Sequence, residues 1–266
     1  MSWAAKRRFF ILLILGAAVA AFLAVVSIAT LYKTPSCTDN IQNQGEAGID
    51  CGGPCPYLCT ALEQPPTVLF TQALANGVGR IDAVALVENK NIDAAAQNVP
   101  YRLTLYGLDR SLLGDITGTL DLPPGATVPV YIPNAVVGPG FSKEGLGSQT
   151  VANAFLDIAP SAPKWFTMAP NSLIVPTVSN TTLAGTVQAP RIEAVLTNPG
   201  FTTLTNVQAT VIVKDANGNV IGASRTVVPA IPAQGQTTAI FTWNYAFPGT
   251  PVSIEVVPAI QLPSPP

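Results

Sequence analysis

Histidine is absent from the 266 residues of this sequence, and charged residues make up only 11% of them. Without an imidazole, the chain cannot build a Ser-His-Asp triad, a Cys-His pair, or a zinc or haem site with histidine ligands. The charged fraction lies far below the roughly 25% of an ordinary soluble domain. The formal net charge of −2 provides no basic surface for nucleic acid, and the glycine-rich stretch 136–149 lacks a nucleotide-binding motif. We therefore expect neither nucleic acid nor nucleotide as a partner.

A long hydrophobic run near the N-terminus predicts a membrane anchor. Residues 9–31 contain no charge, and as a helix they would span roughly 34 Å, more than the roughly 30 Å of a bilayer core. Lys6, Arg7 and Arg8 precede the run and favour a cytoplasmic tail over residues 1–8. The lipid bilayer is thus the first expected partner. The rest of the chain is expected outside the cytoplasm, in a single-pass protein of the cell membrane.

Two other interpretations of this run are a cleaved signal peptide and a lipoprotein. A signal peptide normally has an apolar region of only about 7 to 15 residues, and no small-residue lipobox joins the run to Cys37. The charge distribution agrees with export, because residues 1–36 carry four basic side chains and no acid, whereas residues 37–266 carry nine basic and fifteen acidic ones. We therefore expect an uncleaved signal anchor.

All four cysteines lie in the segment 32–60, at Cys37, Cys51, Cys55 and Cys59. An even number of clustered cysteines outside the cytoplasm predicts two disulfides, for which three pairings exist. A segment with so few large apolar residues needs cross-links because it cannot build a core. The alternative, a zinc or iron–sulfur site, lacks the usual pairs at C-x-x-C spacing.

Oxygen-bearing side chains lie between the first two cysteines. Asp39, Asn43, Glu46 and Asp50 are the ligand types that calcium prefers, and calcium takes about 6 to 8 such oxygens. The alternative is that these side chains cap turns. The sequence thus leaves two interpretations, a calcium site in the cysteine-rich segment and a set of turn caps without a cofactor.

The same stretch resembles the signature C-x-D-x-x-x-N-x-x-E-x-x-x-D-C-G-G-x-C-x-x-C, which lies just outside the membrane in exported proteins. The side chains named above match it together with Gly52 and Gly53, although three residues separate Cys55 from Cys59 where the signature has two. The whole layout is similar to uncharacterised single-pass envelope proteins of the candidate-phyla-radiation bacteria. This resemblance implies an anchor, a DCGG segment and then immunoglobulin-like β domains.

From residue 61 onward the sequence predicts an all-β fold. Runs of Val, Thr, Ile and Leu are separated by Gly, Pro, Asn and Asp, and the frequent prolines disfavour long helices. Apolar residues alternate with others along 191–197 and 207–214, as in strands that bury one face and turn the other toward water or a second surface.

An internal repeat divides this region into two parts. Residues 80–89 (RIDAVALVEN) align with residues 191–198 (RIEAVLTN), and three further pairs of segments follow at a similar offset. Units of about 100 residues predict two tandem immunoglobulin-like β-sandwiches. We assign them to residues 61–163 and 164–262, followed by a Pro-rich tail at 263–266. The repeat also resembles FxLYD-like modules, which implies non-catalytic spacer or interaction domains.

These features predict a membrane-anchored structural or adhesion protein of the cell envelope, which is not an enzyme and contacts other envelope or surface proteins. The repeat aligns Asp82 with Glu193, and this duplication favours a structural role for both acids. One alternative is an accessory subunit of an envelope secretion or pilus assembly, and another is an extracellular hydrolase with a carboxylate pair. The loop 136–149 is a candidate contact surface. Four aromatic residues are further contact candidates, although we expect at least half of them in a core: Trp165, Trp243, Tyr245 and Phe247.

Overall fold

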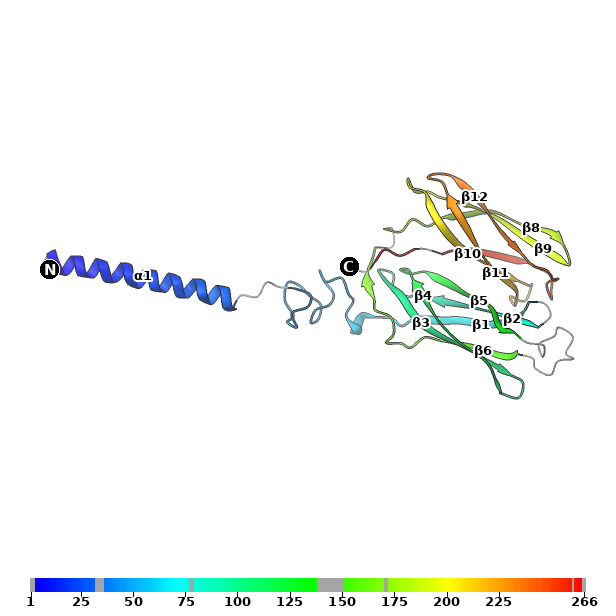
Figure 1. The fold of residues 1–266 in the computed structure, drawn as a ribbon, viewed down its shortest axis with the longest axis horizontal. Helices are drawn as coiled ribbons and strands as arrows, with labels where there is room; N and C mark the ends of the chain where they lie inside the picture. The colour runs from blue at the N-terminus through cyan, green and yellow to red at the C-terminus, as the bar shows by residue number, and fades with distance from the viewer. Residues whose placement is uncertain are drawn as a thin grey trace. The chain divides into compact units, whose positions relative to one another are not determined.

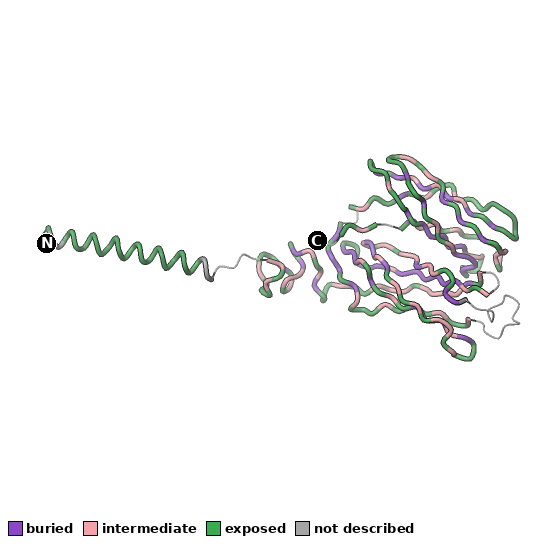
Figure 2. Tube along the Cα trace, viewed as in Figure 1, coloured by how far each residue is buried: buried purple, intermediate pink, exposed green. Residues whose placement is uncertain are grey.

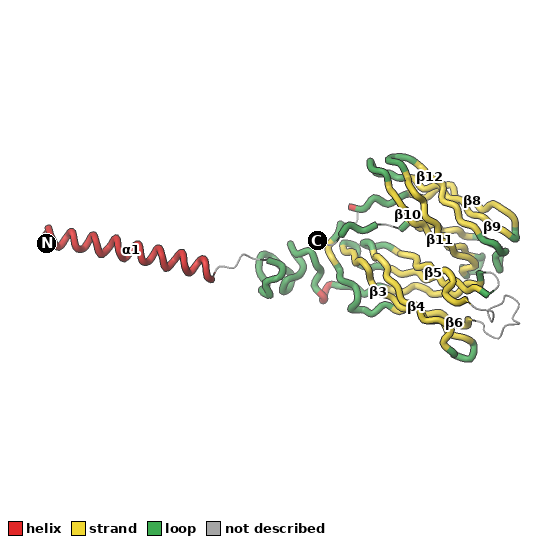
Figure 3. The backbone as a smooth tube through the Cα atoms, in the orientation of Figure 1, coloured by secondary structure: helices red, strands yellow, loops and turns green. Residues whose placement is uncertain are grey.

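In its described residues, the chain contains one α-helix and a series of antiparallel sheets (Figures 1 and 3). It divides into two compact units, Met1–Cys55 and Pro56–Pro266. All the described strands belong to the second unit, where they form two β-sandwiches, so the predicted fold class is confirmed. The computed structural model describes residues 3–31, 36–76, 79–137, 151–169, 172–259 and 261–264.

Helix α1 (Trp3–Leu31) exposes every side chain that the structure describes in it (Figure 2). The apolar part of the helix runs from Lys6 to Ile28, and large side chains such as Leu12 are 70% exposed. Water is an unfavourable surrounding for so much apolar surface, whereas a bilayer would cover it and leave every helical backbone group paired. The length and composition of α1 therefore suit a single membrane crossing or a signal sequence.

The first sandwich packs sheet β1-β2-β5 against sheet β4-β3-β6. All of its strand pairs are antiparallel, and a short strand β7 pairs with the beginning of β3. Its strands are β1 (Thr67–Ala75), β2 (Arg80–Glu88), β3 (Ala94–Gly107), β4 (Leu112–Leu122), β5 (Thr127–Val137) and β6 (Val151–Asp157), with β7 at Phe166–Thr167 and a 3₁₀ turn η1 at Thr60–Leu62.

The second sandwich repeats the same order of strands. Sheet β8-β9-β12 packs against sheet β11-β10-β13, again with antiparallel pairs only. Its strands are β8 (Thr177–Thr186), β9 (Ala189–Thr197), β10 (Leu204–Lys214), β11 (Val220–Ile231), β12 (Gln236–Thr242) and β13 (Ser253–Pro258). The predicted alternation is confirmed, because the apolar residues of one face of β9 and one face of β10 are all buried: Ile192, Ala194, Leu196, Val207, Ala209, Val211 and Val213.

The internal sequence repeat has a structural basis in two buried asparagines, one at the end of β2 and the other at the end of β9. The side-chain nitrogens of Asn89 and Asn198 each donate hydrogen bonds to three backbone carbonyl groups, and each side-chain oxygen accepts from the N–H two residues later. Each asparagine thereby ties the end of its strand to the loop that follows β4 or β11. The carbonyl groups belong to Ala94, Leu122 and Pro123 in the first sandwich and to Thr202, Ile231 and Pro232 in the second.

These matched hydrogen bonds correct the sequence alignment of the two repeats. Asn89 and Asn198 are 109 residues apart, so Asp82 corresponds to Arg191, and the predicted equivalence of Asp82 and Glu193 is wrong. The same offset pairs Gly125 with Gln234, and both residues have positive φ angles, of 58° and 51°. The turns after β4 and β11 therefore place a residue of left-handed backbone conformation at the same position of the repeat.

A third core joins the two sandwiches. The outer face of sheet β1-β2-β5 packs against the outer face of sheet β11-β10-β13, and Gln72 Nε2 donates a 2.9 Å hydrogen bond to the backbone oxygen of Val220. The buried members of this third core are Leu74, Val84 and Leu86 from the first sandwich and Ile212, Val220 and Ala223 from the second. Burial on both faces is typical of a strand with a continuous apolar run, as in residues 83–87 of β2. The two sandwiches thus stand side by side (Figure 1), with the third core between their facing sheets.

Candidate functional site

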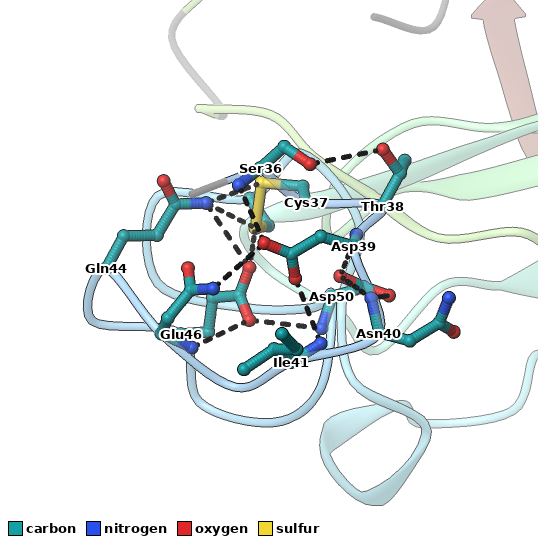
Figure 4. The surroundings of a disulfide bond; sticks show 11 residues. Ser36, Cys37, Thr38, Asp39, Asn40, Ile41, Gln44, Glu46 and Asp50 are labelled. Atoms are coloured by element: carbon teal, nitrogen blue, oxygen red, sulfur yellow. Dashed lines mark hydrogen bonds between the residues drawn. A yellow bond between two sulfur atoms is a disulfide. The ribbon is translucent and has the colours of Figure 1, made fainter. Parts of the chain in front are cut away.

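The cysteine-rich segment is cross-linked, as the sequence predicted (Figure 4). Cys37 is bonded to Cys55 with an S–S distance of 2.02 Å and a Cα–Cα distance of 5.6 Å, and Cys51 and Cys59 are disulfide-bonded as well. Sulfur atoms in disulfides are not thiolates, so this oxidised form offers no ligands for the alternative zinc or iron–sulfur site. Gly53 has a φ of 60°, and a side chain there would clash with the carbonyl oxygen of Gly45. The second glycine of the DCGG segment is therefore required by the backbone.

Asp39 and Asp50 hold the turn that follows Cys37 (Figure 4). The carboxylate of Asp50 accepts hydrogen bonds from the backbone N–H groups of Asp39 and Asn40, the shortest at 2.9 Å. The carboxylate of Asp39 accepts from the backbone N–H of Ile41 at 2.9 Å and from the side-chain nitrogen of Asn43 at 3.0 Å. Aspartate side chains that accept from nearby N–H groups are typical turn caps.

Glu46 is a buried carboxylate beside the disulfide, with only 6% of its surface exposed. One oxygen accepts from the backbone N–H groups of Asn43 and Asp50, and the other accepts from the side-chain nitrogen of Gln44. The latter oxygen also lies 3.1 Å from Cys55 Sγ, a contact without a hydrogen bond because a disulfide sulfur carries no proton. These N–H donors compensate for the desolvation of the Glu46 carboxylate.

The four residues predicted to bind calcium lie together in this turn, and their contacts agree with the turn-cap interpretation. All three carboxylates already accept from N–H donors. Asn43 Oδ1 is buried and has no hydrogen-bond partner in the described part of the chain, so it is the one open oxygen of the set. The sulfur atoms near Glu46 are held in a disulfide and add no ligand. Calcium binding stays one of the two interpretations, and its ligands would be these carboxylates and Asn43 Oδ1.

The basic residues predicted to set the membrane orientation lie in the first turns of α1. Lys6, Arg7 and Arg8 are all exposed, and the guanidinium of Arg7 lies 5.7 Å from the centre of the Trp3 ring. Guanidinium groups and indole rings both favour the interface between lipid and water. The described geometry thus places the cationic and aromatic side chains at one end of the apolar helix.

Other predicted residues have structural surroundings. Trp165 and Trp243 are buried, and Trp243 stacks edge-to-face on the half-buried Phe247 at 4.9 Å, so these aromatic side chains pack in cores. Tyr245 is also half-buried. Of the predicted contact loop 136–149, residues 138–149 lie outside the described residues.

Several acids of the sandwiches also have partners. Three of them form ion pairs, Asp115 with Arg102, Glu193 with Arg191, and Glu255 with Lys214. Asp82 is 1% exposed and accepts hydrogen bonds from the Tyr131 hydroxyl, the Asn134 backbone N–H and the Asn76 side chain. Burial, and then the hydrogen bond to Asp82, raise the pKa of Tyr131 above its usual range. The phenol therefore stays protonated and keeps donating to Asp82.

The sequence matches no family model and no curated protein. Among solved structures, red sea bream transglutaminase is 14% identical, with a TM-score of 0.27, over 74% of this chain. A β-glucuronidase of glycoside hydrolase family 2 is 13% identical, with a TM-score of 0.25, over 86% of this chain. This chain spans only 29% and 27% of those two proteins. Likeness at this level carries no argument about function.

Proposed function

We propose that this chain is a membrane-anchored protein of a cell envelope, whose two β-sandwiches form a rigid, non-catalytic module that contacts other envelope or surface proteins. The observation that carries this proposal is the order of parts along the chain. An exposed apolar helix comes first, a disulfide-bonded segment follows it, and two jointly packed β-sandwiches come last. Disulfides persist in oxidising compartments, which supports a position of this segment outside the cytoplasm.

The packing of the sandwiches supports an interaction role. Loosely linked domains would turn independently, whereas a shared core fixes the angle between them and keeps their surfaces in one arrangement. The immunoglobulin-like character expected from the sequence, and the resemblance to FxLYD-like modules and to DCGG envelope proteins, support the same role. The absence of histidine from the sequence favours a protein that binds over one that catalyses.

Membrane topology is the decisive test. Single cysteines would be introduced by Ser2→Cys and Ser264→Cys in the full chain, and spheroplasts would be treated with a maleimide that cannot cross membranes. We expect labelling of Ser264→Cys in intact spheroplasts and of Ser2→Cys only after lysis. The reverse pattern, or release of the protein by alkaline extraction, would overturn the anchored topology.

Two further measurements test the alternative interpretations, one for the cleavage of the anchor and one for the role of the protein in the envelope. Intact mass of the membrane-extracted protein distinguishes an uncleaved anchor from a cleaved signal peptide. Mild detergent purification distinguishes an independent module from an accessory subunit of a secretion or pilus assembly, because a subunit should bring a stoichiometric partner with it.

A further inference from the structure

The two inner sheets touch along only part of their facing surfaces. Ile212 of β10 and its cross-strand neighbour Ala223 of β11 lie in the third core, whereas the next pair on that face, Thr210 and Arg225, lines an open cleft. On the opposite wall, Tyr131 of β5 lies where the core ends and the cleft begins. The sheets therefore separate toward the beginning of β5 and leave a cleft of about 830 Å³, which β3 and β4 from the other sheet of the first sandwich also line.

This cleft has the size and the position of a ligand site. Ligand pockets commonly measure about 300 to 1,000 Å³ and occur preferentially at interfaces between domains. Both sandwiches contribute polar side chains to its walls, and the first also contributes two aromatic ones. The residues that matter for its chemistry are Tyr101, Asp121 and Tyr131 from the first sandwich and Gln208, Thr210 and Arg225 from the second.

Arg225 gives the cleft a positive group that is not in an ion pair within the described residues. Among the described lining residues only Asp121 and Arg225 are charged, and the Asp121 carboxylate accepts a 2.9 Å hydrogen bond from the backbone N–H of Asn98. Arg225 forms no ion pair or hydrogen bond within the described part of the chain. A guanidinium presents several N–H donors in one plane, which suits a carboxylate of a ligand.

Two tyrosines lie within the electrostatic reach of Arg225. Burial raises the pKa of Tyr101 and of Tyr131, and the charge of Arg225 lowers both in part. Both phenols therefore remain neutral, and each combines an apolar ring with a hydroxyl group. The Tyr101 ring also covers Gly118 on the neighbouring strand β4, where any side chain would collide with the phenol. That glycine leaves room for the Tyr101 ring beside the cleft.

We propose that this cleft binds a carboxylate-bearing glycan, with Arg225 pairing with the carboxylate and Tyr101 contacting a sugar ring. The cleft walls offer hydroxyl, amide, phenol and guanidinium groups, which suit a ligand rich in hydroxyls. A peptide would instead pair its backbone with an edge strand of the lining, such as β5, and the test below distinguishes the two ligands. The proposal goes beyond the protein contacts proposed above and adds a glycan ligand to them.

The test is calorimetric titration of the full chain in detergent micelles with α-1,4-linked trigalacturonic acid. The corresponding neutral galactose trisaccharide and a triglutamate peptide serve as alternative probes. We expect saturable binding of the acidic trisaccharide that weakens with salt, and at least tenfold weaker binding of the neutral one. Binding of the peptide alone, or no binding of the acidic sugar at millimolar concentration, would overturn the proposal.

Substitutions of Arg225 test whether the glycan binds in this cleft. Arg225→Gln should reduce the affinity for the acidic trisaccharide at least tenfold, and Arg225→Lys should lose less because it keeps the charge. Arg191→Gln is the matched control, since it removes the same charge from an exposed position on the outer sheet. Equal affinities of Arg225→Gln and Arg191→Gln would refute the assignment, provided that both variants unfold at the temperature of the parent protein. Glycan binding does not depend on topology, so either proposal can fail without the other.

Discussion

Truncating Ile212 tests whether the third core couples the two sandwiches. Ile212 is fully buried but points out of its own sandwich, toward Val84 and Leu86 of the other. In an isolated second sandwich this side chain would be exposed to water, and Ile212→Ala would change stability little. In the packed pair it removes three buried carbons and leaves a cavity, for which we expect a loss of about 2 to 4 kcal/mol in the free energy of unfolding.

Urea denaturation of the full chain, followed by circular dichroism, measures this loss. Ile240→Ala is the matched control, because Ile240 is the same residue type with 42% of its surface exposed on the outer sheet. We expect a cost of about 1 kcal/mol or less for the control. Hydrogen exchange would show where protection falls, and we expect it to fall in β2 as well as in β10. A loss for Ile212→Ala no greater than that for Ile240→Ala, or confined to the second sandwich, would refute the coupling.

Four further predictions concern other parts of the chain. Asn198→Ala removes a buried amide with four hydrogen bonds and should lower the free energy of unfolding by about 2 to 4 kcal/mol in the same assay. Joint replacement of Cys37 and Cys55 by Ser opens a loop of 18 residues and should destabilise the segment by about 3 kcal/mol, seen as faster proteolysis between residues 36 and 55. The hydrogen bond from Arg102 lowers the pKa of Asp115 below its usual 3.8, so the stability that this pair contributes is present above that pH and is lost as the pH falls through the lower folded value. Asp115→Asn should therefore weaken the acid dependence of the unfolding temperature below about pH 4, by a small amount because the pair is exposed. The turn-cap role of Asp50 leads us to expect no calorimetric signal with millimolar calcium, and a saturable signal that Asp50→Asn abolishes would instead establish a calcium site.

The sequence allowed prediction of the parts of this fold that depend on local patterns. A long uncharged run predicts α1, and the alternation of apolar residues predicts which faces of β9 and β10 are buried. The repeat predicts two sandwiches with one strand order, and the hydrogen bonds of Asn89 and Asn198 give it a physical basis. These features arise within a strand or between strands that follow one another closely.

The sequence did not predict features that depend on distant contacts. The third core has a weak sequence signal, the uninterrupted apolar run 83–87, but its partner strand β10 carries Thr210 among apolar residues and resembles a half-exposed strand. The bond between Cys37 and Cys55 depends on turns held by Glu46 and Asp50, and sequence spacing alone does not show that path. The cleft arises where the two sandwiches meet, so its residues lie on β3, β4, β5, β10 and β11 without forming a motif.

The side-by-side packing of the sandwiches has a mechanical consequence. In a string of separate domains, a pulling force stretches the connecting chain first and reaches the domains afterward. Here the third core joins the two sandwiches directly, so a pulling force acts on this core and not on the chain between β6 and β8. The core therefore has to break before residues 158–176 can extend. Single-molecule stretching should therefore show an initial rupture that releases at most about 65 Å of chain. Tension below that threshold would leave the cleft between the sandwiches intact.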